Sequence, residues 1–382
     1  MPLVFVIRVL KPFYFIKFSS ILSSRIGHFV SDSVHLMILS RNSREEPHRL
    51  IFFEEPSSNE FWAKLVKRNL NINQWSRYLF YWNTKIPGGQ IFNEHSIFLS
   101  NHSRDFDGLF ENSGFKLSFS EEENIKGKDW LKSKGWVEGD PFVCLLVRDE
   151  SYLQSSSILS PDGKGWDYHS YRDSDIEDYL PALDWLTTKG VFVLRMGKLM
   201  KQPIDTDNKR ILDYAFSKER NDFLDVWLFA NCNLCISTGS GPDYISDVFR
   251  RPLLFLNFIP ISHAISWSNA MHVPKKLIWA DSGQELSLRE NINNSWFNTD
   301  HYSDHKIKIQ DMSKDEILVS VRECWEDLEN GLHYSKRDLK LQKRFWEIIR
   351  SEPKSKKLHG WIHPKTRAGT NWLGNRREDF FV

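Results

Sequence analysis

The chain has 382 residues, a formal net charge of +1 and 26% charged residues. At about 100–200 residues per domain, this length predicts two domains. The balanced charge gives no global electrostatic reason to expect nucleic acid as a partner. Four cysteines are too few for a disulfide scaffold and indicate a reducing compartment, so we expect a cytoplasmic protein.

The N-terminal stretch up to Leu22 is apolar and aromatic, but Arg8, Lys11 and Lys17 interrupt it. These charges argue against a membrane-spanning helix, and no signal-peptide core with a small-residue cleavage site is visible. Two interpretations remain open. The stretch is the first strand and its lead-in, which we favour, or it makes peripheral contact with the inner face of the cytoplasmic membrane through apolar and basic residues.

Residues 1–138 alternate candidate strands and helices and are expected to form a first, Rossmann-like domain. Strands are predicted at 49–53 and 78–82. A capping box formed by Ser57 and Glu60 predicts the start of a helix, and a further helix is expected at 126–134.

From residue 139 the pattern is more regular and predicts a second Rossmann-like domain that extends to 335. Unbroken apolar runs alternate with helical patterns, which is typical of a parallel sheet covered on both faces. The expected strands are 142–147, 191–194, 211–214, 233–236 and 253–257. Helices are expected after Ser174 and at 223–229, 243–249 and 313–328. The remaining segment, 336–382, has a helical pattern and a basic tail, and we expect it to pack back on the first domain.

The run from Ser237 to Asp243 follows a predicted strand and opens a short helix. Glycine there permits positive φ and close approach of a ligand, and a helix start offers unpaired N–H groups to an anion. The spacing matches neither a P-loop nor a dinucleotide fingerprint. The alternative is an ordinary strand-to-helix turn with a capping serine. The residues assigned to this anion site are Ser237, Thr238, Gly239, Ser240, Gly241 and Asp243.

Further candidate ligand residues follow the other predicted strands of this domain. Arg148 and Tyr152 come after the first strand, and Arg195, Gly197 and Lys198 come after the second. The carboxyl ends of parallel strands meet at one edge, so these residues and the glycine turn are expected to bind one diphosphate, as in a nucleotide. For each arginine, the alternative is a structural ion pair with a nearby aspartate. The candidates for that pairing are Asp149, Asp175 and Asp213.

No metal site is predicted. Cys232 and Cys235 form a C-x-x-C pair, but no second pair follows at zinc spacing. No carboxylate cluster suggests a bound divalent ion. Apart from a nucleotide-sugar substrate, no cofactor is expected.

Several of these motifs together resemble a family of predicted bacterial glycosyltransferases from O-antigen, lipopolysaccharide and other surface-polysaccharide gene clusters. The resemblance covers about residues 141–260 and is weaker elsewhere. The residues that carry it are Arg148-Asp149 with Tyr152, Tyr171-Arg172, Arg195-Met196-Gly197, Asp213-Tyr214-Ala215 and Ser237-Thr238-Gly239-Ser240-Gly241. It implies a GT-B fold, in which two Rossmann-like domains face a cleft. The second domain then holds a nucleotide-sugar donor, and the first holds a glycan or lipid-linked glycan acceptor.

The stretch Arg25-Ile26-Gly27-His28 is similar to the Gly-Asp loop of heptosyltransferase-like enzymes, whose acidic residue serves as base. The resemblance implies that His28 takes that role, because inverting transfer needs a base for the acceptor hydroxyl proton. Contact with the donor phosphate or capping of the following helix are the alternatives for His28. The rival histidines are His169, His263 and His272.

The expected function is therefore metal-independent transfer of a sugar from a nucleotide-sugar donor to a surface-glycan acceptor. Two other functions remain open at this stage. One is epimerisation of a nucleotide sugar on the same fold, and the other is noncatalytic binding of a nucleotide sugar within a polysaccharide assembly complex.

Overall fold

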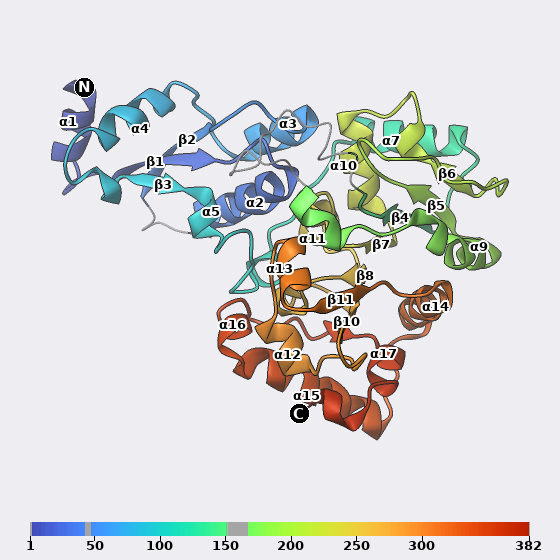
Figure 1. Cartoon of the computed structure of the whole chain (residues 1–382). Coiled ribbons are helices and arrows are strands. Elements are labelled where there is room, and N and C mark those ends of the chain that lie inside the picture. Colours follow the sequence, from blue (N-terminus) through green and yellow to red (C-terminus); the bar gives the residue numbers. More distant parts are fainter. Residues whose placement is uncertain (1, 43–46, 150, 152–166, 382) are drawn as a thin grey trace.

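The computed structural model describes residues 2–42, 47–149, 151 and 167–381 as two α/β units that lie side by side (Figure 1). The first unit is built on three parallel strands in the order β2-β1-β3. These strands are β1 (Ile16–Ile21), β2 (His48–Phe53) and β3 (Asn93–His95). The helices of this unit are α1 (Pro2–Val9), α2 (Ile26–Asn42), α3 (Glu60–Asn69), α4 (Ser76–Thr84), α5 (Ser96–Leu99) and α6 (Leu109–Asn112).

The second unit is built on seven parallel strands in the order β12-β9-β8-β7-β4-β5-β6. Without β12, this is the order 3-2-1-4-5-6 of doubly wound nucleotide-binding sheets, and the order reverses between β4 and β7. Ligands of such sheets bind at the carboxyl ends of the strands beside that reversal. The strands are β4 (Phe142–Leu146), β5 (Phe192–Arg195), β6 (Ile211–Asp213), β7 (Leu234–Ser237), β8 (Leu253–Phe258), β9 (Ala270–Pro274) and β12 (Arg367–Ala368).

Helices cover both faces of this larger sheet, and α7 (Glu121–Ser133) leads into it from the first unit. The other helices are α9 (Leu180–Thr188), α10 (Asp222–Asn231), α11 (Asp243–Val248), α12 (Leu288–Asn293), α13 (Thr299–Asp304), α14 (Lys314–Asn330), α15 (Lys336–Ser351), α16 (Pro353–Lys356) and α17 (Thr370–Gly374). A separate antiparallel pair is formed by β10 (Lys276–Trp279) and β11 (Ile307–Gln310).

Alternate residues of β4 point to opposite faces of the sheet, as the two-residue period of a strand requires. Cys144 and Leu146 belong to a hydrophobic core that continues into the first unit, where it includes Phe29 of α2. Val143 and Leu145 belong to the core under α9, α14 and α15. The first of these cores therefore joins the two units by apolar packing.

The architecture confirms the predicted α/β class, with parallel sheets in both units. Two predictions for the first unit are wrong: the N-cap of α3 is Asn59 and not Ser57, and residues 78–82 lie in helix α4 and not in a strand. In this segment Leu79 and Asn83 are buried and Tyr78 and Tyr81 are exposed. The i, i+4 spacing of the buried pair is helical, and the run of aromatic residues hid it. No helix among the described residues is long and apolar enough to cross a membrane.

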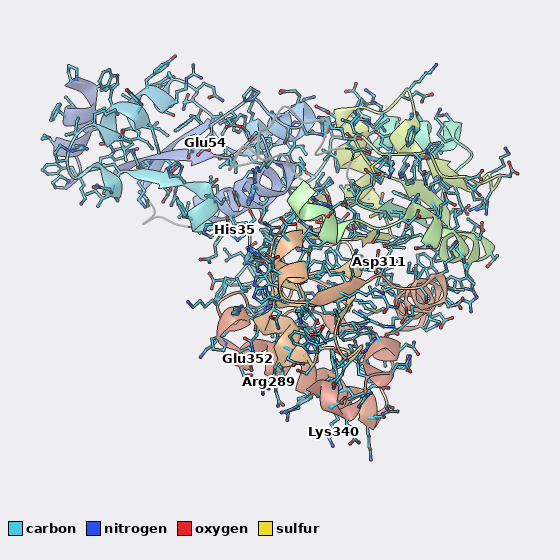
Figure 2. The ribbon with its side chains drawn as sticks, in the orientation of Figure 1. His35, Glu54, Arg289, Asp311, Lys340 and Glu352 are labelled. Atoms are coloured by element: carbon cyan, nitrogen blue, oxygen red, sulfur yellow. The ribbon has the colours of Figure 1, made fainter. Side chains whose placement is uncertain are left out.

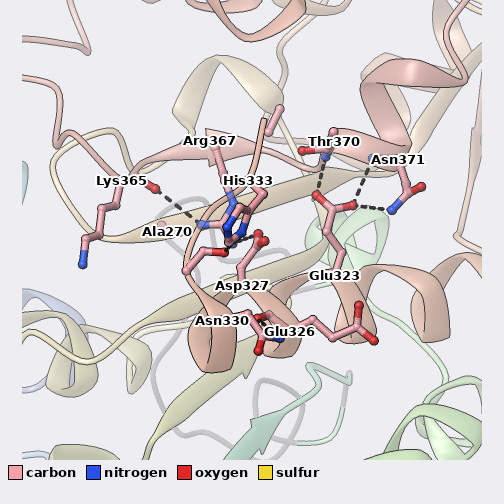
Figure 3. A network of polar contacts seen from close by, with 12 residues as sticks. Ala270, Glu323, Glu326, Asp327, Asn330, His333, Lys365, Arg367, Thr370 and Asn371 are labelled. Atoms are coloured by element: carbon pink, nitrogen blue, oxygen red, sulfur yellow. Dashed lines mark hydrogen bonds and ion pairs between the residues drawn. The ribbon is translucent and has the colours of Figure 1, made fainter. Parts of the chain in front are cut away.

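The C-terminal segment also differs from its expected place on the first unit. Strand β12 extends the larger sheet, and Phe345 and Ile348 of α15 enter the core beneath it. Figure 3 shows how acidic residues of α14 hold this segment: Asp327 pairs with Arg367 at 2.9 Å, and Glu323 accepts from the backbone N–H of Asn371. The basic tail thus finds its carboxylate partners in the second unit.

Two further contacts fix the position of the C-terminal segment. Arg289 of α12 pairs with Glu352 at the end of α15, and Figure 2 labels both residues. Contact with the first unit is made by the loop that follows α16, where the Trp361 N–H donates to the carbonyl of Phe106 at 2.8 Å.

Candidate functional site

A cavity of about 430 Å³, called the central cavity below, lies between the two units. The first unit contributes the start of α2 and the loop that carries Ser103. The second unit contributes residues that directly follow β4 and β5 and the start of α11. The cavity therefore borders the β4–β7 reversal, where the topology of the sheet predicts ligand binding.

Two backbone donors of the glycine turn after β7 are satisfied within the turn itself. The N–H of Gly239 donates to the Ser237 hydroxyl at 3.0 Å, and the N–H of Ser240 donates to Oδ2 of Asp243 at 2.7 Å. The Ser237 hydroxyl donates to that same carboxylate oxygen. Burial raises the pKa of Asp243 to about 6, so the carboxyl group is largely ionised at neutral pH. A carboxylate within the protein thus occupies donors that the sequence analysis assigned to a ligand.

Only part of this turn faces the central cavity. Ser240 and Gly241 line the cavity, whereas Ser237, Thr238 and Asp243 are buried behind it. The Thr238 hydroxyl accepts from the N–H of Arg148 at 3.0 Å and so ties the turn to the end of β4. These three buried residues shape the turn from within.

Among the described residues, four cationic side chains line the central cavity, against two carboxylates. The cations are Arg25, Arg148, Arg172 and Lys198, and the carboxylates are Asp149 and Asp225. Such a surplus of positive charge is suited to an anion with several oxygens, because arginine offers paired donors and lysine a point charge.

Arg148 and Arg172 are the two central members of this group. Burial and the neighbouring Arg172 lower the pKa of Arg148 to about 10, so Arg148 remains protonated near neutral pH. Its Nε lies 3.3 Å from Oδ1 of Asp173. The Arg172 guanidinium donates to the carbonyl of Gly239, and its buried Nε has no acceptor among the described residues. The two neighbouring guanidinium groups repel each other, and a bound anion would reduce that repulsion.

Arg195 lies outside the central cavity. Its side chain is 1% exposed and pairs with Asp213, with its guanidinium 3.1 Å from Oδ2 and 3.0 Å from the carbonyl of Gln202. The structural ion pair named as its alternative is therefore present. Gly197 and Lys198, two and three residues further on, do line the central cavity. Tyr152 lies outside the described residues.

His28 faces the same cavity from the third residue of α2. Its Nδ1 lies 2.6 Å from the Ser103 hydroxyl, and that hydroxyl donates to Oδ1 of Asp32 at 2.8 Å. The single hydroxyl proton is used on Asp32, so the neutral imidazole must donate from Nδ1 and carry its lone pair on Nε2. No partner for Nε2 exists among the described residues.

The electrostatics of this histidine keep it neutral. Burial, together with Arg25 and His102, lowers the pKa of His28 to about 4. Asp32 is fully buried, and burial raises its pKa to about 6 despite donation from Ser100 and Ser103. Above pH 6 the arrangement is therefore a neutral imidazole linked through a hydroxyl to a buried carboxylate. Such a carboxylate would stabilise the imidazole once it gains a proton.

The loop that supplies Ser103 has an unusual backbone. Asn101, His102 and Ser103 all have positive φ values, of 48°, 60° and 63°. Left-handed residues other than glycine cost about 1–3 kcal/mol each where they are strained, and they concentrate at functional sites. The Ser103 N–H donates to the Ser100 hydroxyl at 2.9 Å, which helps to fix the loop. The hydroxyl beside His28 is thus held by a defined turn.

The rival histidines occupy different surroundings. His272 is buried in β9, where its Nε2 accepts from the N–H of Ile265 at 3.0 Å. His263 lines a smaller cavity of about 190 Å³ and contacts the Arg104 guanidinium. His169 lies in the 3-10 segment Asp167–Arg172. Neither His272 nor His263 lines the central cavity, and the His169 side chain lies outside the described part of the chain.

Sequence reasoning omitted four residues from the site: Arg172, Asp225, Asp32 and Ser103. Arg172 belongs to one of the motifs that carry the family resemblance, but no predicted strand directly precedes it. Asp225 lines the cavity from α10 and accepts from the Tyr214 hydroxyl at 2.9 Å. Asp32 follows His28 by one helical turn, and that i, i+4 spacing was the available signal. No pattern in the sequence links Ser103 to His28.

The described residues contain no group of three or more metal-binding side chains. Metal independence of the reaction stays a prediction.

Comparison with known proteins yields structural similarities only. No protein-family model and no curated protein matches the chain. A glycosyl transferase family 9 structure from Veillonella parvula DSM 2008 shares 13% identity at a TM-score of 0.41, over 68% of this chain and 86% of its own. The E. coli ADP-heptose lps heptosyltransferase II shares 14% identity at a TM-score of 0.38, over 69% of this chain and 91% of its own. Both similarities are weak, and the cavity itself carries the functional conclusion.

Proposed function

We propose that this chain is a glycosyltransferase that moves a sugar from a nucleotide-sugar donor to a glycan acceptor without a metal ion. The observation that carries this proposal is that one cavity is lined by cations from the second unit and by a neutral histidine from the first. Arg148, Arg172 and Lys198 provide positive charge at the strand reversal of the second unit. His28 provides a neutral imidazole with an open Nε2 from the first unit.

The cationic wall suits the diphosphate of the donor. In transfer, the bond between the anomeric carbon and the diphosphate oxygen breaks, and negative charge develops on the leaving group. Guanidinium and ammonium groups fixed in place before the reaction stabilise that charge without reorganisation. Ser240 and Gly241, at the start of α11, border the same space. The diphosphate itself leaves as part of the nucleoside diphosphate.

His28 is suited to act as the base. The acceptor hydroxyl oxygen forms the new bond to the anomeric carbon, and its proton passes to Nε2 of His28. The resulting imidazolium is stabilised by Asp32 through the Ser103 hydroxyl. A pKa of about 4 keeps Nε2 unprotonated at neutral pH, and the negative charge of a bound donor raises its proton affinity during the reaction.

The acceptor belongs to surface polysaccharide synthesis in this proposal and is a glycan of the O-antigen, lipopolysaccharide or capsule type, free or lipid-linked. This part rests on the motif resemblance at residues 141–260. The reaction takes place in the cytoplasm, where sugar nucleotides are available, and nucleic acid has no role.

The test is a thermal-shift panel of nucleoside diphosphates and sugar nucleotides on the purified chain. We expect at least one to raise Tm, and Arg148→Ala and Arg172→Ala to abolish that rise. Lys340→Ala serves as a matched control, because Lys340 is an exposed cation on α15. If no nucleotide stabilises the wild-type chain, the donor site proposed here is excluded.

Epimerisation of a nucleotide sugar is the second candidate function, and Asp225 is the observation that favours it. Burial raises the pKa of Asp225 to about 6, and the residue lines the central cavity together with His28. Epimerisation requires acid and base groups at two faces of the sugar. Interconversion of a sugar nucleotide in the absence of any acceptor would favour this function over transfer.

A further inference from the structure

An aromatic surface covers the end of the first unit that is remote from the second. We define it as the exposed side chains of residues 3–14 and 75–91, on and around the neighbouring helices α1 and α4 (Figure 1). Of the 21 large hydrophobic side chains exposed in the described part of the chain, 12 belong to this surface. Phe13 is 89% exposed and Val9 is 75% exposed. Soluble proteins rarely expose so many apolar groups together without a partner.

The fold fixes this surface in place. Val4 and Ile7 of α1 are buried against Leu79 of α4 in a small core. The Arg8 guanidinium donates to Oδ1 of Asn83 at 2.8 Å and to the carbonyl of Ile86 at 3.0 Å. Since these contacts hold the inner faces of both helices, the outer faces cannot turn inward. Their exposure is a property of the folded unit.

The composition of the surface indicates what covers it. No Asp or Glu occurs in residues 2–31 or in residues 61–93. Exposed cations stand beside exposed rings: Arg77 lies 4.9 Å from the ring centre of Tyr78, and Lys85 lies 5.1 Å from that of Tyr81. Tyrosine and tryptophan are enriched where a protein meets lipid head groups, and lysine and arginine are attracted to anionic lipids.

We propose that the aromatic surface docks the first unit on the surface of an anionic lipid bilayer. The apolar side chains of α1 and the following turn enter the head-group layer, and Lys11, Arg77 and Lys85 contact the negatively charged lipids. A second copy of the chain fits less well, because a twofold contact pairs this surface with itself and brings cations of both copies together, with no Asp or Glu from either segment to offset them. The proposal goes beyond sugar transfer and does not depend on it.

The test is cosedimentation of the full chain with two kinds of vesicle, phosphatidylcholine alone and phosphatidylcholine with about 30% phosphatidylserine. We expect at least tenfold tighter binding to the anionic vesicles, and weaker binding at high salt. The double variant Phe13→Ser/Tyr81→Ser tests the apolar contribution, and Lys11→Glu/Lys85→Glu tests the charge. Each should reduce binding at least tenfold, while CD spectra and Tm stay close to those of the wild type.

Matched controls lie at the opposite end of the molecule. Leu339 on α15 is 54% exposed, and its neighbour Lys340, labelled in Figure 2, is also exposed. Leu339→Ser and Lys340→Glu should bind vesicles within twofold of the wild type. Equal sedimentation of the surface variants and the wild type would overturn the proposal. So would light scattering that shows a dimer which the same variants dissociate. The rise in Tm that a nucleotide causes should be the same in these variants as in the wild type. Failure of vesicle binding can therefore be distinguished from failure of the proposed donor site.

Discussion

Two glycine-bearing helix starts meet in the central cavity, and they differ in what they offer a ligand. At α11 in the second unit, Ser237 and Asp243 already accept from the N–H groups of Gly239 and Ser240. At α2 in the first unit, the N–H groups of residues 26–28 have no acceptor among the described residues. Two backbone donors of the conspicuous glycine turn are therefore taken by its own side chains, whereas the donors of the plainer helix start are not.

This difference assigns separate tasks to the two units. The second unit meets an anion chiefly with side-chain cations, beside a turn in which the N–H groups of Gly239 and Ser240 are already occupied. The first unit presents a neutral imidazole, which suits a reacting hydroxyl, and its helix start can add backbone N–H donors to the same anion. A glycine-rich turn after a strand thus indicates where a ligand lies without identifying the groups that bind it.

The strongest test of this division is His28→Ala. Loss of the proposed base should lower kcat by about 10²–10⁴-fold, the range typical of general base catalysis, and leave the donor Kd nearly unchanged. Steady-state kinetics with nucleotide titration measures both quantities. His333→Ala, at an exposed histidine of the second unit, is the control and should retain full activity. Turnover at the wild-type rate by His28→Ala would show that His28 is not the base.

Arginine substitutions test the second unit. Arg148→Ala or Arg172→Ala should weaken binding of a nucleoside diphosphate by about 10–100-fold, because each removes charge-assisted hydrogen bonds of about 1.5–3 kcal/mol. Tm should change little, since either substitution also relieves the repulsion within the pair. Calorimetric titration and thermal melts give the two values.

Arg195→Ala is the contrasting variant. Its ion pair with Asp213 is almost fully buried on the arginine side, so the substitution should reduce the free energy of unfolding by about 3 kcal/mol. Nucleotide affinity of the folded fraction should stay within a few-fold of the wild type. A loss of affinity as large as that of Arg172→Ala would show that the buried arginine also contributes to binding.

Asp32→Asn tests the support behind the base. The variant keeps acceptors for Ser100 and Ser103 but removes the charge that stabilises a protonated His28, so kcat should fall about tenfold, or about 1.4 kcal/mol. Stability should move the other way. The folded pKa of Asp32 is about 6, above its ordinary value of 3.8, so ionisation costs stability above pH 6 and that cost disappears as the pH falls toward 4. Asp32→Asn should therefore raise Tm at pH 8 and have little effect at pH 4. An equal change in Tm at both pH values would argue against this carboxylate titrating in the fold.

The sequence predicted the second unit better than the first for a physical reason. Strands covered on both faces are unbroken apolar runs, as in 142–147 and 253–257, and such runs are easy to recognise. In α4, a run of exposed aromatic residues has the sequence pattern of a strand. Nothing in the neighbouring sequence shows that these residues lie on the surface of a helix. The site divides in the same way. Residues directly after strands were found, whereas Ser103 reaches His28 only through tertiary contact.

The smallest expected effect concerns the contact between the two helix starts. A Cβ added at Gly27 would lie 3.0 Å from Cα of Gly241, and one added at Gly241 would lie 3.0 Å from the N of Gly27. Gly27→Ala should therefore separate the units by a few tenths of an ångström and lower kcat a few-fold, with a loss of about 1 kcal/mol in stability. Helix propensity alone favours alanine at this position, so a loss would report the contact itself. Gly374→Ala, in open space at the end of α17, is the control.

In a double-mutant cycle, Gly27→Ala and Gly241→Ala should be less than additive, because the first substitution already opens the gap that the second needs. Strict additivity would mean that the two glycines do not share a contact in solution. Contacts other than this one would then have to position His28 opposite the cationic side chains of the second unit.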